Sequence, residues 1–214
     1  MYLSWAAYYE GSSDEKYFNV LIPRLIDNIL LNDGVRPYDV ALTPSVTFGI
    51  PVRDFDTAAD QICARREEFH ILIVHADSGG RNLQKNIAFR REALVEKAVE
   101  KCGFEPSTTA FLTPIKELEA WAIADFEAVL AAFGAKSDPE GILPTTPKEA
   151  EALLDPKATL RDFSRSFSKR KNSDAGIMVR IAQEQNIEVL RNAASFLEFE
   201  ESLKLALEHV GCIK

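Results

Sequence analysis

The sequence predicts an α/β fold: a doubly wound, mostly parallel sheet with a C-terminal helical extension. Short apolar runs alternate with segments of helical periodicity over residues 1–133. The run at residues 70–75 is apolar at consecutive positions, which is typical of a central parallel strand covered on both faces. Beyond residue 147 only helical patterns remain.

Each element of this fold has its own signal. Apolar and β-branched runs predict four strands, at residues 2–9, 39–46, 70–75 and 109–112. Apolar residues at helical spacing predict four helices between and after them, at residues 14–31, 57–69, 83–102 and 115–133. Ser-Ser-Asp before the first helix offers an N-cap, and Pro114 opens the last. This alternation implies right-handed crossovers between parallel strands.

The composition changes at Gly134. Residues 134–147 are rich in Pro, Gly, Ser and Thr, which indicates a linker or a long loop. Three further helices are expected, at residues 156–167, 175–184 and 186–210. We therefore expect a core at residues 1–133 and, at residues 134–214, a linker plus a helical extension packed on that core.

The bulk composition restricts the function. The 214 residues carry a net charge of −8, which counts against a free-standing protein that binds duplex DNA tightly. No apolar run is long enough to span a membrane, and no basic leader opens the chain, so we expect no membrane partner. The three scattered cysteines, Cys63, Cys102 and Cys212, argue against a disulfide framework or a zinc cluster and favour a cytoplasmic location.

Acidic residues follow three of the predicted strands. Glu10 comes after the first, Asp77 after the third, and the pair Glu117 and Glu119 after the fourth. Parallel sheets place ligands at the carboxyl ends of their strands. Each acid alone is explained as well by a solvated loop or a helix cap, but the three positions together indicate a cluster of ionisable groups.

Three sequence elements resemble a known family. They are Glu10-Gly11-Ser12-Ser13-Asp14, then His75-Ala76-Asp77-Ser78-Gly79, then Lys116-Glu117-Leu118-Glu119-Ala120-Trp121 with Asp125. Together they resemble the Toprim-like family catalogued as domain of unknown function 4276. The tail, with Lys169 and the Ala194–Phe199 segment, is similar too, so the resemblance covers most of the chain.

The resemblance implies a Toprim-like metal site, Mg²⁺ or Mn²⁺, for hydrolysis of phosphodiester bonds in nucleic acid. It also implies an ATPase partner protein in a bacterial anti-phage defence system. Glu10, Asp77 and Glu119 would be the metal ligands and catalytic residues, with Glu117 as a further ligand or general base. His75 stands where the family has an acid. Imidazole binds Mn²⁺ or Zn²⁺ but suits Mg²⁺ poorly, so His75 is either a ligand with altered metal preference or an ordinary polar residue.

Basic and glycine-rich segments suggest where phosphate would bind. Ser78 and Arg81 flank Gly-Gly before a helix that carries Lys85, an arrangement that either cradles phosphate or is a flexible turn. The segment at residues 161–171 interleaves basic residues, Lys169 among them, with Phe163 and Phe167. It reads either as a surface that stacks nucleotides or as an amphipathic helix with its rings in the core.

The sequence therefore favours a metal-dependent nuclease, or phosphodiesterase, that acts with a partner. Two alternatives remain open. One is a catalytically inactive Toprim-like subunit that regulates or binds an ATPase complex, since His75 would cost it the second metal. The other is a nucleotide sensor that uses residues 78–81. A homo-oligomer also stays open.

Overall fold

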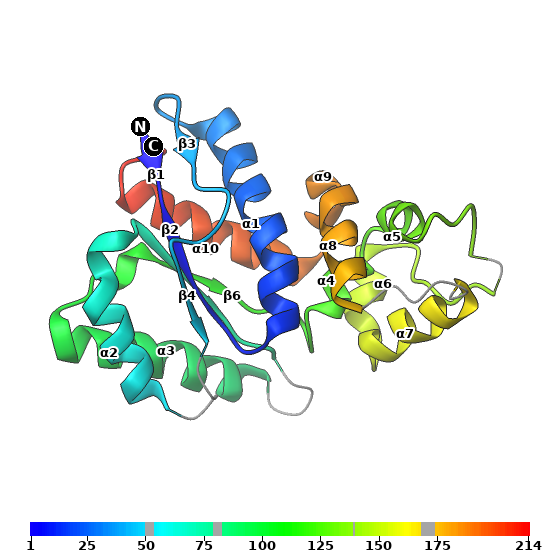
Figure 1. Ribbon diagram of the computed structural model, residues 1–214, viewed down its shortest axis with the longest axis horizontal. Coiled ribbons are helices and arrows are strands. Elements are labelled where there is room, and N and C mark those ends of the chain that lie inside the picture. The colour runs from blue at the N-terminus through cyan, green and yellow to red at the C-terminus, as the bar shows by residue number, and fades with distance from the viewer. Residues whose placement is uncertain (50–53, 79–82, 139, 168–173) are drawn as a thin grey trace.

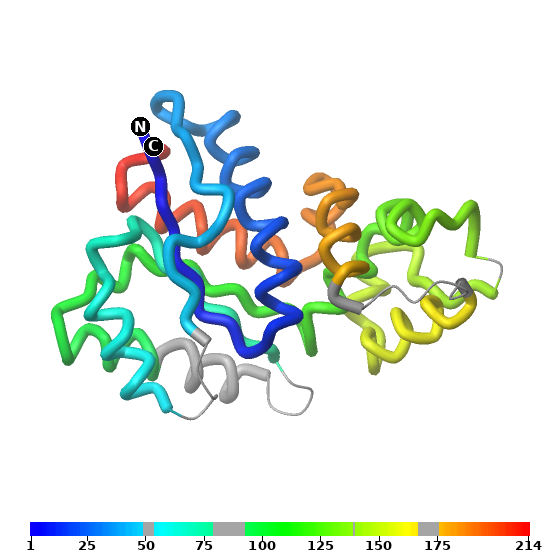
Figure 2. Tube along the Cα trace, in the orientation of Figure 1, coloured from blue at the N-terminus to red at the C-terminus, as the bar shows by residue number. Residues whose placement is uncertain are grey.

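The computed structural model describes the backbone of residues 1–49, 54–78, 83–138, 140–167 and 174–214 (Figures 1 and 2). Within α3 (Leu83–Cys102) the side chains are described from residue 93 onwards. All statements below concern these residues.

A parallel four-stranded sheet forms the centre of the molecule. Its strand order is β4-β2-β5-β6, where the strands are β2 (Trp5–Tyr9), β4 (Val46–Gly49), β5 (Ile71–His75) and β6 (Thr109–Leu112). All three pairings are parallel, and every residue of the central strands β2 and β5 is buried. The expectation of an α/β fold with a mostly parallel sheet is confirmed.

Alternate residues of each central strand belong to two separate cores. Trp5, Ala7, Ile71 and Ile73 join the core under α1 (Ser12–Asp33) and α10 (Ala194–His209). Their neighbours in sequence, among them Ala6 and Leu72, join the core under α2 (Phe55–Arg65) and α3. Successive strand residues point to opposite faces, so helices on both faces need apolar side chains at every position. The continuous apolar run of β5 has this cause.

Two predicted strands are each divided. The first divides at Ser4 into β1 (Tyr2–Leu3) and β2, and the second into β3 (Asp39–Val40) and β4. β1 and β3 form their own parallel pair. At the break, the Ser4 backbone N–H donates to His70 Nδ1 (3.1 Å) instead of to a neighbouring strand. Side-chain bonds of this kind compete with sheet ladders, and the sequence pattern does not reveal them.

Two predicted helices are interrupted as well. The helix expected at residues 115–133 is a loop followed by α4 (Glu119–Ala122) and α5 (Phe126–Phe133), because Asp125 caps α5 by accepting from Ala128 N (3.2 Å). The helix expected at residues 186–210 is α9 (Ile187–Leu190) followed by α10. In both cases a side chain binds the free amides at the start of the second helix: Asp125 at α5, and Glu151, from α6, at α10.

The C-terminal helices return to the core. They include α6 (Pro147–Ala152), α7 (Pro156–Phe167) and α8 (Asp174–Glu184), and α4 to α8 lie together on one side of the sheet (Figure 1). Tyr17 Oη of α1 donates to Gln185 Oε1 (2.6 Å), just after α8. Phe111 N of β6 donates to Ser202 Oγ of α10 (3.0 Å). These bonds join the C-terminal part to the sheet, while the boundary at residue 133 stays a prediction.

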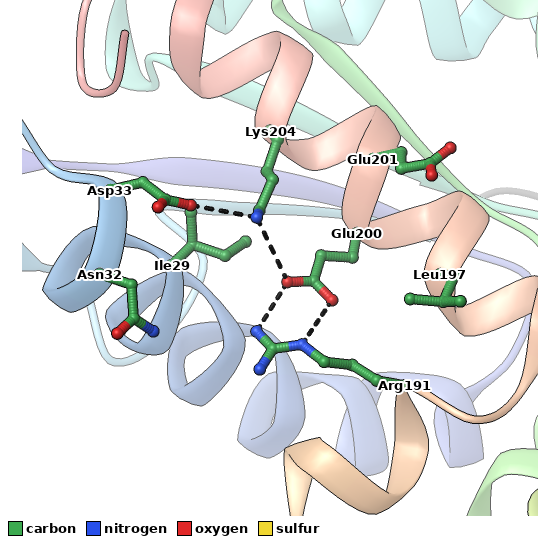
Figure 3. Close-up of a pocket in the computed structure, with 8 residues that line it drawn as sticks. All are labelled: Ile29, Asn32, Asp33, Arg191, Leu197, Glu200, Glu201 and Lys204. Atoms are coloured by element: carbon green, nitrogen blue, oxygen red, sulfur yellow. Dashed lines mark hydrogen bonds and ion pairs between the residues drawn. The ribbon is translucent and has the colours of Figure 1, made fainter.

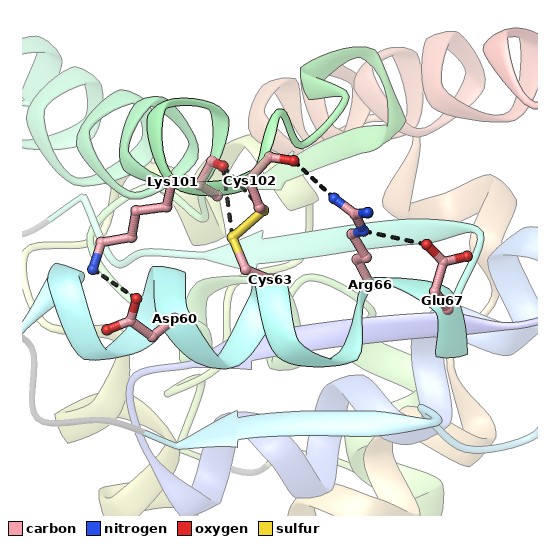
Figure 4. Close-up of a disulfide and its surroundings, with 7 residues drawn as sticks. Asp60, Cys63, Arg66, Glu67, Lys101 and Cys102 are labelled. Atoms are coloured by element: carbon pink, nitrogen blue, oxygen red, sulfur yellow. Dashed lines mark hydrogen bonds and ion pairs between the residues drawn. A yellow bond between two sulfur atoms is a disulfide. The ribbon is translucent and has the colours of Figure 1, made fainter.

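The structure contains a disulfide, although the scattered cysteines argued against a disulfide framework. Cys63 of α2 and Cys102 at the end of α3 are bonded, with their Cα atoms 5.9 Å apart (Figure 4). Two short 3-10 helices, η1 (Arg66–Glu68) and η2 (Pro106–Thr108), lie nearby in the chain. The two cysteines are 39 residues apart in sequence, and only the packing of α2 against α3 brings them together. Cys212 is free and buried.

Among the described residues, no helix has both the length and the apolar character needed to cross a membrane.

Candidate functional site

The predicted acids lie at the carboxyl ends of three adjacent strands. Glu10 follows β2, Asp77 follows β5, and the loop with Glu117 and Glu119 follows β6; the sheet places β2, β5 and β6 next to one another. The Asp77 backbone N–H donates to Glu10 Oε2 (3.4 Å). The edge of the sheet therefore brings Glu10 and Asp77 into contact.

His75 is the most buried member of the site. Its ring is 0% exposed and packs against Phe18, with ring centroids 5.0 Å apart. Nδ1 lies 3.5 Å from Asp14 Oδ2, and Nε2 lies 3.3 Å from Asp77 Oδ1. Both ring nitrogens and Asp77 Oδ1 are buried without a hydrogen bond. Such atoms are rare in folded proteins and mark places where a further ligand or proton would be stabilised.

Asp14 is a member that the sequence analysis did not select. It looked like an acid in the first turn of α1, a position that the helix dipole favours. In the structure it is 7% exposed and faces His75. Burial raises the pKa of Asp14, which the neighbouring His75 lowers and the charges of Asp77 and Glu10 raise. Its spacing four residues after Glu10, on the first turn of the helix after β2, was the available signal.

Glu119 joins the acidic group to the C-terminal helices. It is the first residue of α4, it is 8% exposed, and its Oε1 lies 3.6 Å from Lys157 Nζ. Burial and the charge of Glu117 raise the pKa of Glu119, Lys157 lowers it, and the charge of Asp77 raises it further. Asp77 and Glu119 are thus close enough for their charges to interact.

Glu117 is held differently. Its Oε1 accepts a hydrogen bond from the backbone N–H of Lys157 (2.9 Å), in the first turn of α7. That bond satisfies one of the free amides at the helix start. The residue before it, Lys116, has a φ of 66°, which is strained for a residue with a side chain. The strained loop turns the chain between β6 and α4 so that Glu117 serves α7 while Glu119 faces the acids.

Of the predicted phosphate-binding residues, Ser78 is the one whose side chain the structure describes. Ser78 is fully buried and its Oγ accepts from the backbone N–H of Lys116, so it joins the loops after β5 and β6. Arg81 and Lys169 lie outside the described residues, and the side chain of Lys85 does too. In the basic segment after residue 161, Phe163 is fully buried, as an amphipathic helix requires.

The donor chemistry fits a divalent cation. Carboxylate oxygens are the ligands that Mg²⁺ and Mn²⁺ prefer, and Glu10, Asp14, Asp77 and Glu119 supply them around a buried, unsatisfied Asp77 oxygen. Within the described part of the chain, however, no three acidic, His or Cys side chains already surround a single point as metal ligands. A bound ion would therefore require the side chains to close around it.

Apart from the acidic group, a charged cavity of about 360 Å³ lies between α1, α9 and α10 (Figure 3). There Arg191 makes a bidentate pair with Glu200 (2.7 and 2.9 Å), and Lys204 binds Asp33 (3.0 Å). Arg191, Glu200, Lys204 and Asp33 each face an opposite charge, whereas Glu201 points away from them (Figure 3). This network ties α1, α9 and α10 together.

Comparisons with known proteins identify no relative. No family model, no curated protein and no solved structure matches the chain. The function is therefore inferred from the site itself and from the motif resemblance.

Proposed function

We propose that this protein hydrolyses phosphodiester bonds of nucleic acid with a divalent ion, Mg²⁺ or Mn²⁺, held by Glu10, Asp77 and Glu119. The observation that carries the proposal is the meeting of acids from three separate loops at one sheet edge, around a buried Asp77 oxygen that lacks a hydrogen bond. Buried like charges are unfavourable in the absence of a counter-charge, so this arrangement is typical of a functional site.

A divalent ion at such a site activates water and offsets negative charge on a phosphate. The protein's own contribution is positional. The Asp77 amide orients Glu10, and the strained turn at Lys116 directs Glu119 toward Asp77. Asp14 holds His75 from one side while Asp77 lies on the other. Asp14 thereby fixes the imidazole, and with it the Asp77 carboxylate.

The test is cleavage of plasmid and single-stranded substrates, DNA and RNA, with Mg²⁺ or Mn²⁺. We expect Asp77→Asn, which keeps the shape and removes the charge, to lower the rate at least about a hundredfold, as loss of a key electrostatic group does. Glu67→Gln is the matched control, because it removes one charge from an exposed side chain (89%) outside the site. Equal cleavage by wild type and Asp77→Asn would refute the assignment.

One observation favours a second candidate, a regulatory or binding subunit without catalysis. The His75 ring lies between two carboxylates, Asp14 and Asp77, and so occupies the space between them that an ion would otherwise take. Calorimetric titration separates the candidates. The catalytic proposal expects Mn²⁺ to bind the wild type and not Asp77→Asn. The regulatory one expects no binding by either, and no cleavage.

The ATPase partner, the role in anti-phage defence, the cytoplasmic location and a homo-oligomer belong to the same proposal. They rest on the motif resemblance and on composition. Co-purification of the tagged chain with its native partners tests the first of them.

A further inference from the structure

A cavity of about 440 Å³ borders the acidic site on the side of the C-terminal helices. Its lining comes from α7, from α8, and from Ser13 and Glu119 at the starts of α1 and α4. This volume falls in the range of small-molecule and cofactor pockets. Because Glu119 lines the cavity and also interacts with Asp77, the cavity and the acidic site are neighbours.

One wall of the cavity is basic. Lys157, Arg161 and Arg165 line it from α7 at a spacing of four residues, which places them on one face of the helix. Their side chains are 66%, 58% and 69% exposed, so they reach solvent and are available to a ligand. In a chain of net charge −8, three cations along a single helix face are a local exception.

The ion pairs that these cations already make do not prevent them from binding a ligand. Asp162 lies 3.0 Å from Arg165 and 3.9 Å from Arg161, so one carboxylate serves two guanidinium groups. Lys157 Nζ is 3.6 Å from Glu119. Exposed ion pairs of this kind contribute little and give way to a stronger ligand. Guanidinium groups bind phosphate through paired hydrogen bonds, which are stronger.

Another part of the cavity lining is apolar. It consists of Leu160 of α7 and of Ile177 and Met178 of α8. All three are largely buried, with exposed fractions of 8%, 5% and 4%, so they form a firm floor. A flat aromatic ring packs well on such a floor, and the polarisable Met sulfur makes favourable contacts with ring edges.

We propose that this cavity binds one nucleotide of a single-stranded nucleic acid, with phosphates along Lys157, Arg161 and Arg165 and a base on the floor of Leu160, Ile177 and Met178. The inference rests on the proposed function, since Glu119 then leads the strand from the cavity to the acidic site. A single strand is the partner because a base must leave its stack to reach the floor, and unpaired strands offer such bases.

The experiment measures binding of a fluorescent single-stranded pentanucleotide, DNA and RNA, by anisotropy in EDTA, so that no metal-dependent cleavage occurs. The test variant is Arg161→Ala/Arg165→Ala. The control is Lys97→Ala/Lys101→Ala, which removes the same charge from α3, far from α7 across the molecule (Figure 1). All four side chains are partly or largely exposed, so both variants should fold.

We expect the test variant to weaken binding at least about tenfold at 0.1 M salt, and the control to change it less than about twofold. The slope of log affinity against log salt should fall by about 1.4, because each contact with a single-strand phosphate contributes about 0.7. A pentanucleotide lacking its bases should bind the wild type at least about tenfold more weakly, through loss of stacking.

Two results would overturn the inference: equal weakening by the test and control variants, or a free mononucleotide that binds as tightly as the pentanucleotide. The second would instead indicate a nucleotide sensor. Asp77→Asn keeps the two proposals apart, since it should retain strand binding. Intact binding without metal-dependent cleavage by the wild type refutes the nuclease proposal alone, and cleavage that is unchanged in the Arg161→Ala/Arg165→Ala variant refutes the cavity alone.

Discussion

Glu151 and Glu119 are buried to nearly the same degree, but the groups around their carboxylates differ. Their exposed fractions are 9% and 8%. Glu151 accepts three hydrogen bonds: from Ala194 N (2.9 Å), from Ser195 N (3.0 Å) and from Ser195 Oγ (2.5 Å). Glu119 has a long ion pair with Lys157 (3.6 Å), and burial together with two acidic neighbours raises its pKa.

The two carboxylates differ in the hydrogen-bond donors that surround them. Glu151 belongs to α6, and its carboxylate lies at the start of α10, where free amides and the helix dipole favour a negative charge. Ser195 extends the network by accepting from Trp121 Nε1 (2.7 Å), so the carboxylate holds α4, α6 and α10 together. At the sheet edge, among the described side chains, both ring nitrogens of His75 and Asp77 Oδ1 are buried without a hydrogen bond. A fold retains unsatisfied groups of this kind where a ligand completes them.

The largest expected effect is on the satisfied carboxylate. Glu151→Ala leaves the half-buried Ala194 amide, the buried Ser195 amide and the Ser195 hydroxyl without their partner. We expect a loss of about 3 kcal/mol in the free energy of unfolding, measured by urea denaturation, because each orphaned buried group costs roughly 1–3 kcal/mol. Glu198→Ala, on the exposed face of α10, is the control and should stay within about 0.5 kcal/mol. A similarly small change for Glu151→Ala would contradict the difference drawn between Glu151 and Glu119.

Metal should act on the other region alone. If Mn²⁺ completes the acidic site, an ion concentration of a hundred times its Kd raises the free energy of unfolding by about 2.7 kcal/mol. The measurement is thermal unfolding of wild type and Asp77→Asn across a Mn²⁺ titration. We expect the stabilisation in wild type only. A stabilisation of equal size in both proteins would place the ion elsewhere.

Ser195→Ala tests whether the Glu151 network is continuous. The substitution leaves the buried Trp121 indole N–H without its acceptor and removes a donor to Glu151. We expect a loss of about 2 kcal/mol, together with a shift in tryptophan fluorescence. Cleavage activity should persist in the folded variant, since Ser195 supports the loop before α4 through Ile115 N (3.4 Å) but is not one of the acids proposed to hold the ion. Loss of activity without loss of stability would show that the two regions are coupled.

The smallest expected effect is an increase in the free energy of unfolding. The raised pKa of Glu119 means that its ionised form is disfavoured in the folded state, so the residue costs stability at neutral pH. That cost fades as the pH falls through the folded pKa and is absent below the ordinary value of a glutamate. Glu119→Gln should therefore stabilise the protein at pH 7, by less than about 1 kcal/mol, and not at pH 4. Urea denaturation at the two pH values measures the difference, and destabilisation at pH 7 would contradict it.

The sequence by itself determined the α/β class and most element positions. The bounds of α3, β6 and α7 agree with the prediction, because each has a strong local signal: consecutive apolar residues or helical spacing between clear stops. It also placed Glu10, Asp77 and Glu119 after strands. The parallel order made their meeting foreseeable, since strand ends share one edge of the sheet.

Tertiary structure alone decided the rest, because the decisive contacts join residues distant in sequence. The breaks at Ser4, Asp125 and Ala193 depend on side-chain bonds that no periodicity encodes. The disulfide depends on α2 lying beside α3. Asp14 looked like an ordinary helix-start acid until His75, sixty-one residues later, was placed against it. These long-range neighbours set which buried carboxylate accepts several hydrogen bonds and which lies beside other acids.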